Sequence, residues 1–264
     1  MNPFEDLFFQ NLLARLTTPG VIGIAIAGSY SRNEQSQHSD MDVDIFVESL
    51  PDDFYTLRII DEKLVSLKYV LLRDEYASLT KPEKAIWAVP GLRQMQILLD
   101  ETGQLAKLKQ AAFDFNWTVL QNAANEFAVE NLMLCAEETH KIIGGLLQEN
   151  ESKVLYASWG MFKNMSFAAA VQAGLMIESE NRIFAMLQDH FGKDHAWTRA
   201  FRLSFGMDVG DANISVYQTR GRAALDLYEQ TAVLFEKIIN DKHREVIENA
   251  LQLISSYKQS YPYA

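Results

Sequence analysis

Cysteine, long apolar runs and positive charge are all scarce in this sequence. It has 264 residues and one cysteine, Cys135, and it holds no window of about 18 uninterrupted apolar residues. A single cysteine excludes a disulfide framework and a cysteine-based zinc site, and it favours a reducing compartment. The missing apolar run, together with an N-terminus unlike a signal peptide, predicts a soluble cytoplasmic protein with no membrane partner.

The shortage of positive charge narrows the choice of partners. Lys and Arg number 24 against 35 Asp and Glu, and the net charge is −11. Non-specific duplex binding needs a basic surface, so no nucleic-acid partner is expected. The balance is compatible with a small cationic substrate, although many acidic proteins are acidic only for solubility. With 48% hydrophobic residues, the chain can bury the core of one large or two modest domains.

The hydrophobic pattern changes along the chain. Up to residue 103, short apolar runs and turn residues predict helices at 4–16 and 52–61, strands at 21–27, 42–48, 64–72 and 93–100, and a structured loop at 84–93. Beyond residue 103 the period is helical throughout, with one long helix expected over Trp117–Gln148. The predicted fold class is α+β: a small mixed-sheet domain over residues 1–112, followed by an all-α helical bundle over residues 113–264.

One segment of the first domain carries a recognisable chemical pattern. The strand at 21–27 ends in Gly28-Ser29, a polar loop follows, and Asp40-Met-Asp42 opens the next strand. Glycine lets the backbone approach a phosphate chain, and a serine hydroxyl can donate to a phosphate oxygen. Aspartates two apart on a strand point to one face, where a hard divalent ion such as Mg²⁺ finds carboxylate ligands. The alternative is a turn at Ser39-Asp40 followed by a strand with a wet face.

The segment Gly28–Val47 resembles the signature of the DNA polymerase β-type nucleotidyltransferase superfamily. That signature is a hydrophobic strand, Gly-Ser, a spacer and an Asp-x-Asp pair with hydrophobic flanks. The α+β domain followed by a helical bundle is similar to kanamycin nucleotidyltransferase and its aminoglycoside and lincosamide relatives. The resemblance implies an enzyme that uses Mg²⁺ and a nucleoside triphosphate, with the acceptor in a cleft between two domains and, in many relatives, a homodimer.

The resemblance also assigns roles to residues of this loop. Gly28 and Ser29 would cradle the nucleotide phosphates, and Arg32 and Ser39 lie in the same loop and are further candidates for phosphate contact. Asp40 and Asp42 would bind the metal, which stabilises charge on the phosphoryl group and on the leaving pyrophosphate. For Arg32, a solvated loop cation is the competing interpretation.

A second match lies in the helical half. Kanamycin-type enzymes carry a Glu-x-x-x-Lys pair, in which the glutamate is the general base for the acceptor hydroxyl and the lysine contacts the nucleotide. Glu137 and Lys141 reproduce that spacing. An exposed i,i+4 salt bridge explains the same spacing without any catalytic role. Glu130 and Glu138 are the other candidate bases.

The sequence departs from the superfamily at one position. A third acidic residue usually comes from the middle of the next strand, where this chain has Ser66. Three explanations stay open: the two aspartates and the nucleotide bind the metal alone, Asp44 or Glu62 replaces the acid, or the chain binds nucleotide without turnover.

These observations lead to three functional hypotheses. The first is transfer of a nucleoside monophosphate, most simply AMP from ATP, to a hydroxyl of a small molecule such as an aminoglycoside- or lincosamide-like antibiotic. The second is a non-catalytic nucleotide-binding or regulatory module. The third is a nucleotidyltransferase that modifies a protein or RNA partner, against which the lack of a basic surface counts.

Overall fold

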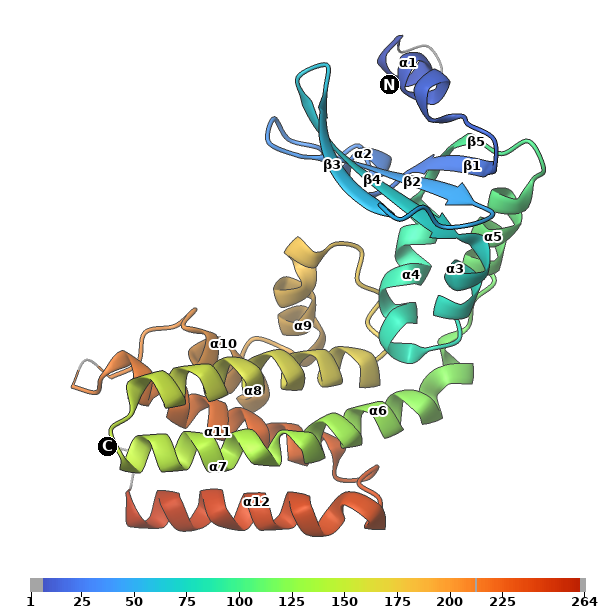
Figure 1. Cartoon of the computed structure of the whole chain (residues 1–264). Helices are drawn as coiled ribbons and strands as arrows, with labels where there is room; N and C mark the ends of the chain where they lie inside the picture. Colours follow the sequence, from blue (N-terminus) through green and yellow to red (C-terminus); the bar gives the residue numbers. More distant parts are fainter. Residues whose placement is uncertain (1–6, 212, 262–264) are drawn as a thin grey trace. The chain divides into compact units, whose positions relative to one another are not determined.

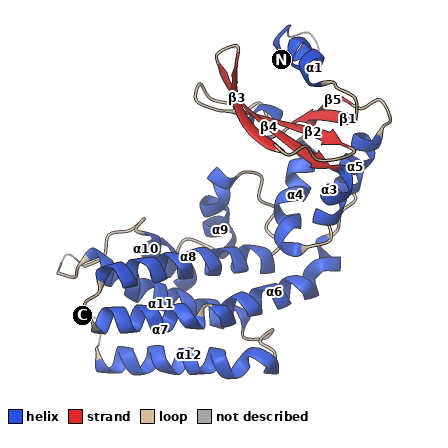
Figure 2. Cartoon of the chain, in the orientation of Figure 1, coloured by secondary structure: helices blue, strands red, loops and turns tan. Residues whose placement is uncertain are grey.

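The computed structural model describes residues 7–211 and 213–261 and divides into two compact units. Unit 1 comprises the residues up to Thr118 together with Met176–Glu180, and unit 2 comprises Val119–Leu175 and the residues from Asn181 onward. All strands of the described residues lie in unit 1, and unit 2 is helical (Figure 2). The predicted α+β class is therefore confirmed. A domain boundary at residues 112 and 113 stays a prediction, since compactness does not establish independent folding.

Unit 1 is built on a mixed sheet. Over the described residues it has five strands in the order β3-β4-β2-β1-β5. The β2–β4 pair is parallel and the other three pairs are antiparallel. The strands are β1 Val21–Ile26, β2 Met41–Val47, β3 Tyr55–Ile60, β4 Lys63–Leu71 and β5 Gln96–Leu99.

The two faces of the sheet are covered by different helices. Helix α1, Leu7–Leu16, supplies Phe8, Phe9 and Leu12 to the apolar core on one face. On the other face lie three helices, α3 Leu72–Ser78, α4 Pro82–Gln94 and α5 Gln104–Phe113 (Figure 1). Successive residues of a strand point to opposite faces. The apolar residues of β2 that join the α1 core therefore leave Asp42 and Asp44 on the α3–α5 face.

The helix predicted at residues 52–61 is wrong. Tyr55–Ile60 forms the edge strand β3, paired antiparallel with β4. Asp61 and Glu62 both have positive φ values, 48° and 66°, as expected of the two central residues of a type I′ hairpin turn. Pairing with β4 gives these residues a ladder of hydrogen bonds, which outweighs the weak helical pattern of the segment.

The loop predicted at residues 84–93 is also wrong, because this segment belongs to helix α4. Pro82 occupies the first turn, and Pro90 lies inside the helix. Proline at position 90 has no N–H to donate to the carbonyl of Ile86. The Ile177 N–H donates to that carbonyl instead, at 2.7 Å. The proline thus leaves an acceptor that binds the segment Met176–Glu180 to unit 1.

Replacing Pro90 with Ala tests this link. Alanine restores an N–H that competes with Ile177 for the Ile86 carbonyl, so the Ile177 amide should exchange with deuterium about threefold to tenfold faster. Amide hydrogen exchange of the native protein measures the change. Pro82→Ala is the control, because an N–H in the first turn has no carbonyl of its own helix to reach. Unchanged exchange at Ile177 in Pro90→Ala would contradict the link.

Unit 2 consists of helices. Within the described residues they are α6 Gln121–Leu134, α7 Ala136–Leu147, α8 Glu151–Gln172, α9 Ile183–Phe191, α10 Ala196–Phe205, α11 Val216–Phe235 and α12 Asp241–Ser260. Two 3₁₀ turns, Trp117–Leu120 and Glu180–Arg182, span the unit boundaries. No described helix combines the length and the apolarity that crossing a membrane requires.

The single long helix predicted over Trp117–Gln148 is interrupted at Cys135. This residue ends α6 and precedes α7, so Glu130 and Glu137 belong to different helices. The thiol is buried, and burial raises the pKa of Cys135 to about 12. The one cysteine is therefore a neutral core side chain at the junction of two helices.

Candidate functional site

The bend that follows β1 lies directly against Asp42. The bend begins the one-turn helix α2, Gly28–Ser31. Gly28 has φ +61°, and a Cβ atom at this position would lie 2.0 Å from Oδ2 of Asp42. The Ala27 N–H also donates to the Asp42 carbonyl at 2.9 Å. Only glycine fits here, because the backbone is left-handed and because the carboxylate occupies the space of a side chain.

Asp42 lies in a field of several charges. Burial raises the pKa of its carboxyl, and the neighbouring Asp40 carboxylate raises it further, while Arg32 and Lys68 lower it. The two aspartates of the Asp-x-Asp pair are thus close enough to repel each other, and both remain partly accessible to solvent. Two carboxylates held in this way favour a bound cation, since a cation offsets both the repulsion and the cost of burial.

Arg32 is held by the protein rather than solvated. Its side chain is 13% exposed, and Nε lies 2.8 Å from Oε2 of Glu34. One terminal nitrogen donates to the carbonyl of Glu178 at 3.1 Å. Glu178 belongs to the segment Met176–Glu180, which is held to the rest of unit 1 by the hydrogen bond from Ile177 to the Ile86 carbonyl. The guanidinium is therefore positioned beside Asp42 by two parts of the unit that are far apart in the sequence.

Ser39 takes part in the turn of the loop. Its hydroxyl accepts a hydrogen bond from the Ser36 N–H at 2.8 Å, and the two serine hydroxyls lie 3.2 Å apart. This geometry fixes the loop immediately before Asp40. A role for Ser39 in phosphate contact stays a prediction.

The parallel pairing of β2 and β4 determines what surrounds the aspartates. Asp42 lies opposite Ser66, and Asp44 lies opposite Lys68. Ser66 is 4% exposed, and Lys68 pairs with Glu75 of α3 at 3.9 Å. Sequence reasoning overlooked Lys68, although its spacing of two from Ser66 places it on the same face of the strand.

The donor set suits a metal that arrives with a nucleotide. No group of three or more His, Cys, Asp or Glu side chains in the described ranges is arranged to hold a metal ion. Magnesium is commonly bound by one or two carboxylates together with substrate phosphates. Asp40 and Asp42 supply two carboxylates, and the bend at Gly28 leaves backbone accessible beside them. The residues present therefore fit a metal shared with a triphosphate, and they do not form a complete protein cage.

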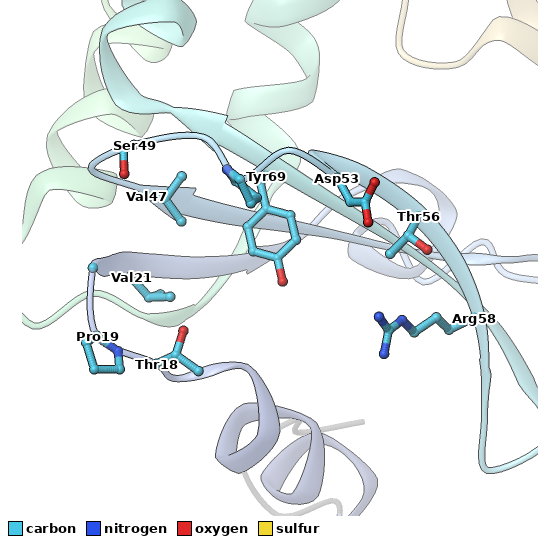
Figure 3. Close-up of a pocket in the computed structure, with 11 residues that line it drawn as sticks. Thr18, Pro19, Val21, Val47, Ser49, Asp53, Thr56, Arg58 and Tyr69 are labelled. Atoms are coloured by element: carbon cyan, nitrogen blue, oxygen red, sulfur yellow. The ribbon is translucent and has the colours of Figure 1, made fainter.

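A cavity of about 380 Å³ lies elsewhere in unit 1. Its lining includes Thr18, Val47, Arg58 and Tyr69 (Figure 3). Tyr69 lies opposite Ile45, and Arg58 lies opposite Val65. Ile45 and Val65 belong to the core under α1, so the cavity opens on the sheet face opposite Asp42. Neither aspartate of the Asp-x-Asp pair lines it.

Glu137 and Lys141 belong to unit 2. The Glu137 carboxylate lies 2.8 Å from Nζ of Lys141, and the Glu137 side chain is 73% exposed. The hydrogen bond that Lys141 donates lowers the pKa of Glu137, and donating to Glu137 and Glu138 raises the pKa of Lys141. Lys141 also contacts Glu138 at 3.1 Å, and the Glu138 side chain is 18% exposed. The expected salt bridge is thus present, and its catalytic role stays a prediction.

The fold is similar to that of a nucleotidyltransferase-like protein of known structure. A crystal structure of a nucleotidyltransferase-like protein from Exiguobacterium sibiricum 255-15 superposes with a TM-score of 0.51 at 15% sequence identity. The match covers 90% of this chain and 79% of that chain. No protein-family model matches the sequence, and neither does any curated protein. At this level of identity the likeness is one of fold.

Replacing Gly28 with Ala tests the contact with Asp42. Gly20, with φ +90° and nothing within 4 Å of the place that a Cβ would take, is the matched control. Both alanines bear the strain of a left-handed backbone, about 1 kcal/mol or more. Only Gly28→Ala also displaces Asp42, which should lower the free energy of unfolding by about 1 kcal/mol further. Denaturant unfolding measures the difference, which should vanish when Asp42 is replaced by Ala.

The pH dependence of stability tests the environment of Asp44. Burial raises the pKa of this carboxyl from 3.8 to about 6, with Lys68 opposing the shift. A raised pKa favours folding below the unfolded pKa, and this contribution is lost as pH rises through the folded pKa. Relative to Asp44→Asn, the natural protein should lose about 1 to 3 kcal/mol of stability between about pH 4 and pH 7.

Thermal unfolding at several pH values in the presence of EDTA measures this loss. The exposed Asp53→Asn variant is the control for removal of one negative charge. Equal stability differences at pH 4 and pH 7 would show that Asp44 is not in the environment described.

Proposed function

We propose that this protein is a Mg²⁺-dependent nucleotidyltransferase that moves a nucleoside monophosphate, AMP from ATP, to a hydroxyl of a small molecule. The observation that carries the proposal is the Asp42 carboxylate seated against the Gly28 bend, with Asp40 beside it. The fold likeness to a nucleotidyltransferase-like protein agrees with it. An aminoglycoside- or lincosamide-like antibiotic is one acceptor that the resemblance to kanamycin-type enzymes implies.

Different residues of unit 1 would contact the phosphates and the metal ion. Backbone at Gly28 and the Ser29 hydroxyl would contact the β- and γ-phosphates, and Arg32, already fixed beside Asp42, would offset their charge. Asp40 and Asp42 would hold the magnesium ion. When bound, the ion would stabilise the negative charge that develops on the phosphoryl oxygens and on the leaving group.

The transfer would form one bond and break another. The acceptor oxygen would bond to the α-phosphorus while the bond from this phosphorus to the oxygen bridging to the β-phosphate breaks, and pyrophosphate would leave with the electron pair. The hydroxyl proton would pass to a carboxylate, for which we propose Glu137. Lys141 would then contact the triphosphate. We also propose a cytoplasmic location and, from the resemblance, a homodimer in which each subunit would carry these residues.

A second function is favoured by one observation. Ser66 lies opposite Asp42, where the superfamily usually has its third acid, and no three-ligand group exists in the described parts of the chain. A chain with two carboxylates could bind Mg²⁺ and nucleotide as a regulatory module without turnover. Binding without transfer to any acceptor would separate this function from the first.

Replacing Asp42 with Asn tests the main proposal. The amide is nearly isosteric but carries no charge, so Mg²⁺-dependent ATP binding should weaken by about a hundredfold or more and transfer should fall below detection. Glu137→Gln should retain binding and lose transfer. Isothermal titration with ATP and Mg²⁺ measures binding. Transfer is measured with α-labelled ATP and a panel of aminoglycosides, lincosamides and simple alcohols.

Asp53→Asn, an exposed substitution on the same unit, controls for charge. Circular dichroism establishes that each variant is folded. Normal ATP binding by Asp42→Asn would remove the metal assignment, and label appearing on a co-purified protein or RNA would favour a macromolecular acceptor.

A further inference from the structure

The edge of the sheet next to Ser66 carries an exposed apolar strip. Its members are Tyr55, Leu57 and Ile59 of β3 and Leu64 of β4, with exposed fractions of 53%, 52%, 69% and 41%. We call these four residues the apolar ladder. Large apolar side chains gathered on a protein surface commonly mark a binding site.

The strand register places the apolar ladder on the face of the sheet that carries the aspartates. Leu57 lies opposite Ser66, and Ser66 lies opposite Asp42. Residues directly opposite in neighbouring strands share a face. Leu57, Ser66 and Asp42 therefore form one row across three strands, and with strands about 4.8 Å apart the row is about 10 Å long.

The direction of the reaction assigns this row to the acceptor, and this step rests on the proposed function. The pyrophosphate would leave over the end of β1, where Gly28 and Arg32 lie. An in-line displacement requires the attacking oxygen to approach from the opposite side of the α-phosphorus. Starting from the aspartates on β2, that opposite side is β4 and then β3, because β1 and β4 flank β2.

The chemistry of the row selects the acceptor. Alternation along β3 and β4 leaves one charged side chain on this face of the two strands, Lys68, which is a cation. A polycationic acceptor would find no carboxylate on β3 or β4, and the Glu75 carboxylate of α3 already pairs with Lys68 at 3.9 Å. An acceptor with an apolar face would bury Leu57 and Ile59, which lack apolar cover in the described structure.

We infer that the apolar ladder binds the acceptor, and that the acceptor is a hydroxyl compound with an extended apolar face rather than a polycation. The apolar face would lie over Tyr55, Leu57 and Ile59. The hydroxyl would then project past the small Ser66 toward the α-phosphorus. Position 66 carries a small, buried serine in place of a bulky acid, so no long side chain stands in this path.

The experiment uses the chain of 264 residues and two probes, 4-phenyl-1-butanol as the apolar alcohol and kanamycin as the polycation. Saturation-transfer NMR titrations with a nonhydrolysable ATP analogue and Mg²⁺ present give the affinity for each. Leu57→Ser and Ile59→Ser should each weaken phenylbutanol binding by about tenfold, because an apolar contact is lost. Arg58→Ser is the matched control: it lies between them on the same strand and points to the opposite face.

Binding of the ATP analogue should be the same in the natural protein and in all three variants. Phenylbutanol binding that is insensitive to Leu57→Ser and Ile59→Ser, or preferential binding of kanamycin, would overturn the inference. A dimer by sedimentation that Leu57→Ser converts to a monomer would also overturn it, since a second copy would then cover the ladder. If the natural protein binds phenylbutanol through Leu57 but does not bind the ATP analogue, the proposed function fails and the acceptor role falls with it.

Discussion

The close approach of Gly28 to the Asp42 carboxylate is the constraint on which the candidate site depends. A carboxylate 2.0 Å from a would-be Cβ leaves no room for a side chain at residue 28. The bend therefore lies against a half-buried carboxylate, and burial together with the neighbouring Asp40 disfavours the charged form of Asp42 unless a cation is near. Arg32 supplies one positive charge beside Asp42, and a metal bound with a triphosphate would supply more.

The sheet separates two environments by the alternation of its side chains. One face is an apolar core under α1, with a cavity lined by Arg58 and Tyr69 at its margin. The other face carries the aspartates, Lys68 and the apolar ladder in consecutive rows. Because neighbouring strands align their side chains, a pair of carboxylates and an exposed apolar surface lie about 10 Å apart on one face.

A proline inside α4 contributes to the site from a distance. Pro90 leaves the Ile86 carbonyl without its helical donor, the Ile177 N–H takes that place, and the next residue, Glu178, accepts from Arg32. Three segments that are far apart in the sequence thus orient one guanidinium. Proline in a helix is usually destabilising, and here the carbonyl that it leaves without a helical donor accepts from a distant segment.

Local patterns in the sequence determined the α+β class, the strands β1, β2 and β4, and the Gly-Ser bend before Asp-x-Asp, because alternation and turn residues act over a few neighbours. Tertiary structure decided the rest. Pairing with β4 made residues 55–60 a strand, and a donor from a distant segment, the Ile177 N–H, allowed Pro90 within a helix. The contact of Gly28 with Asp42 and the row from Asp42 to Leu57 depend on strand order and register, which are set by long-range packing that no local pattern encodes.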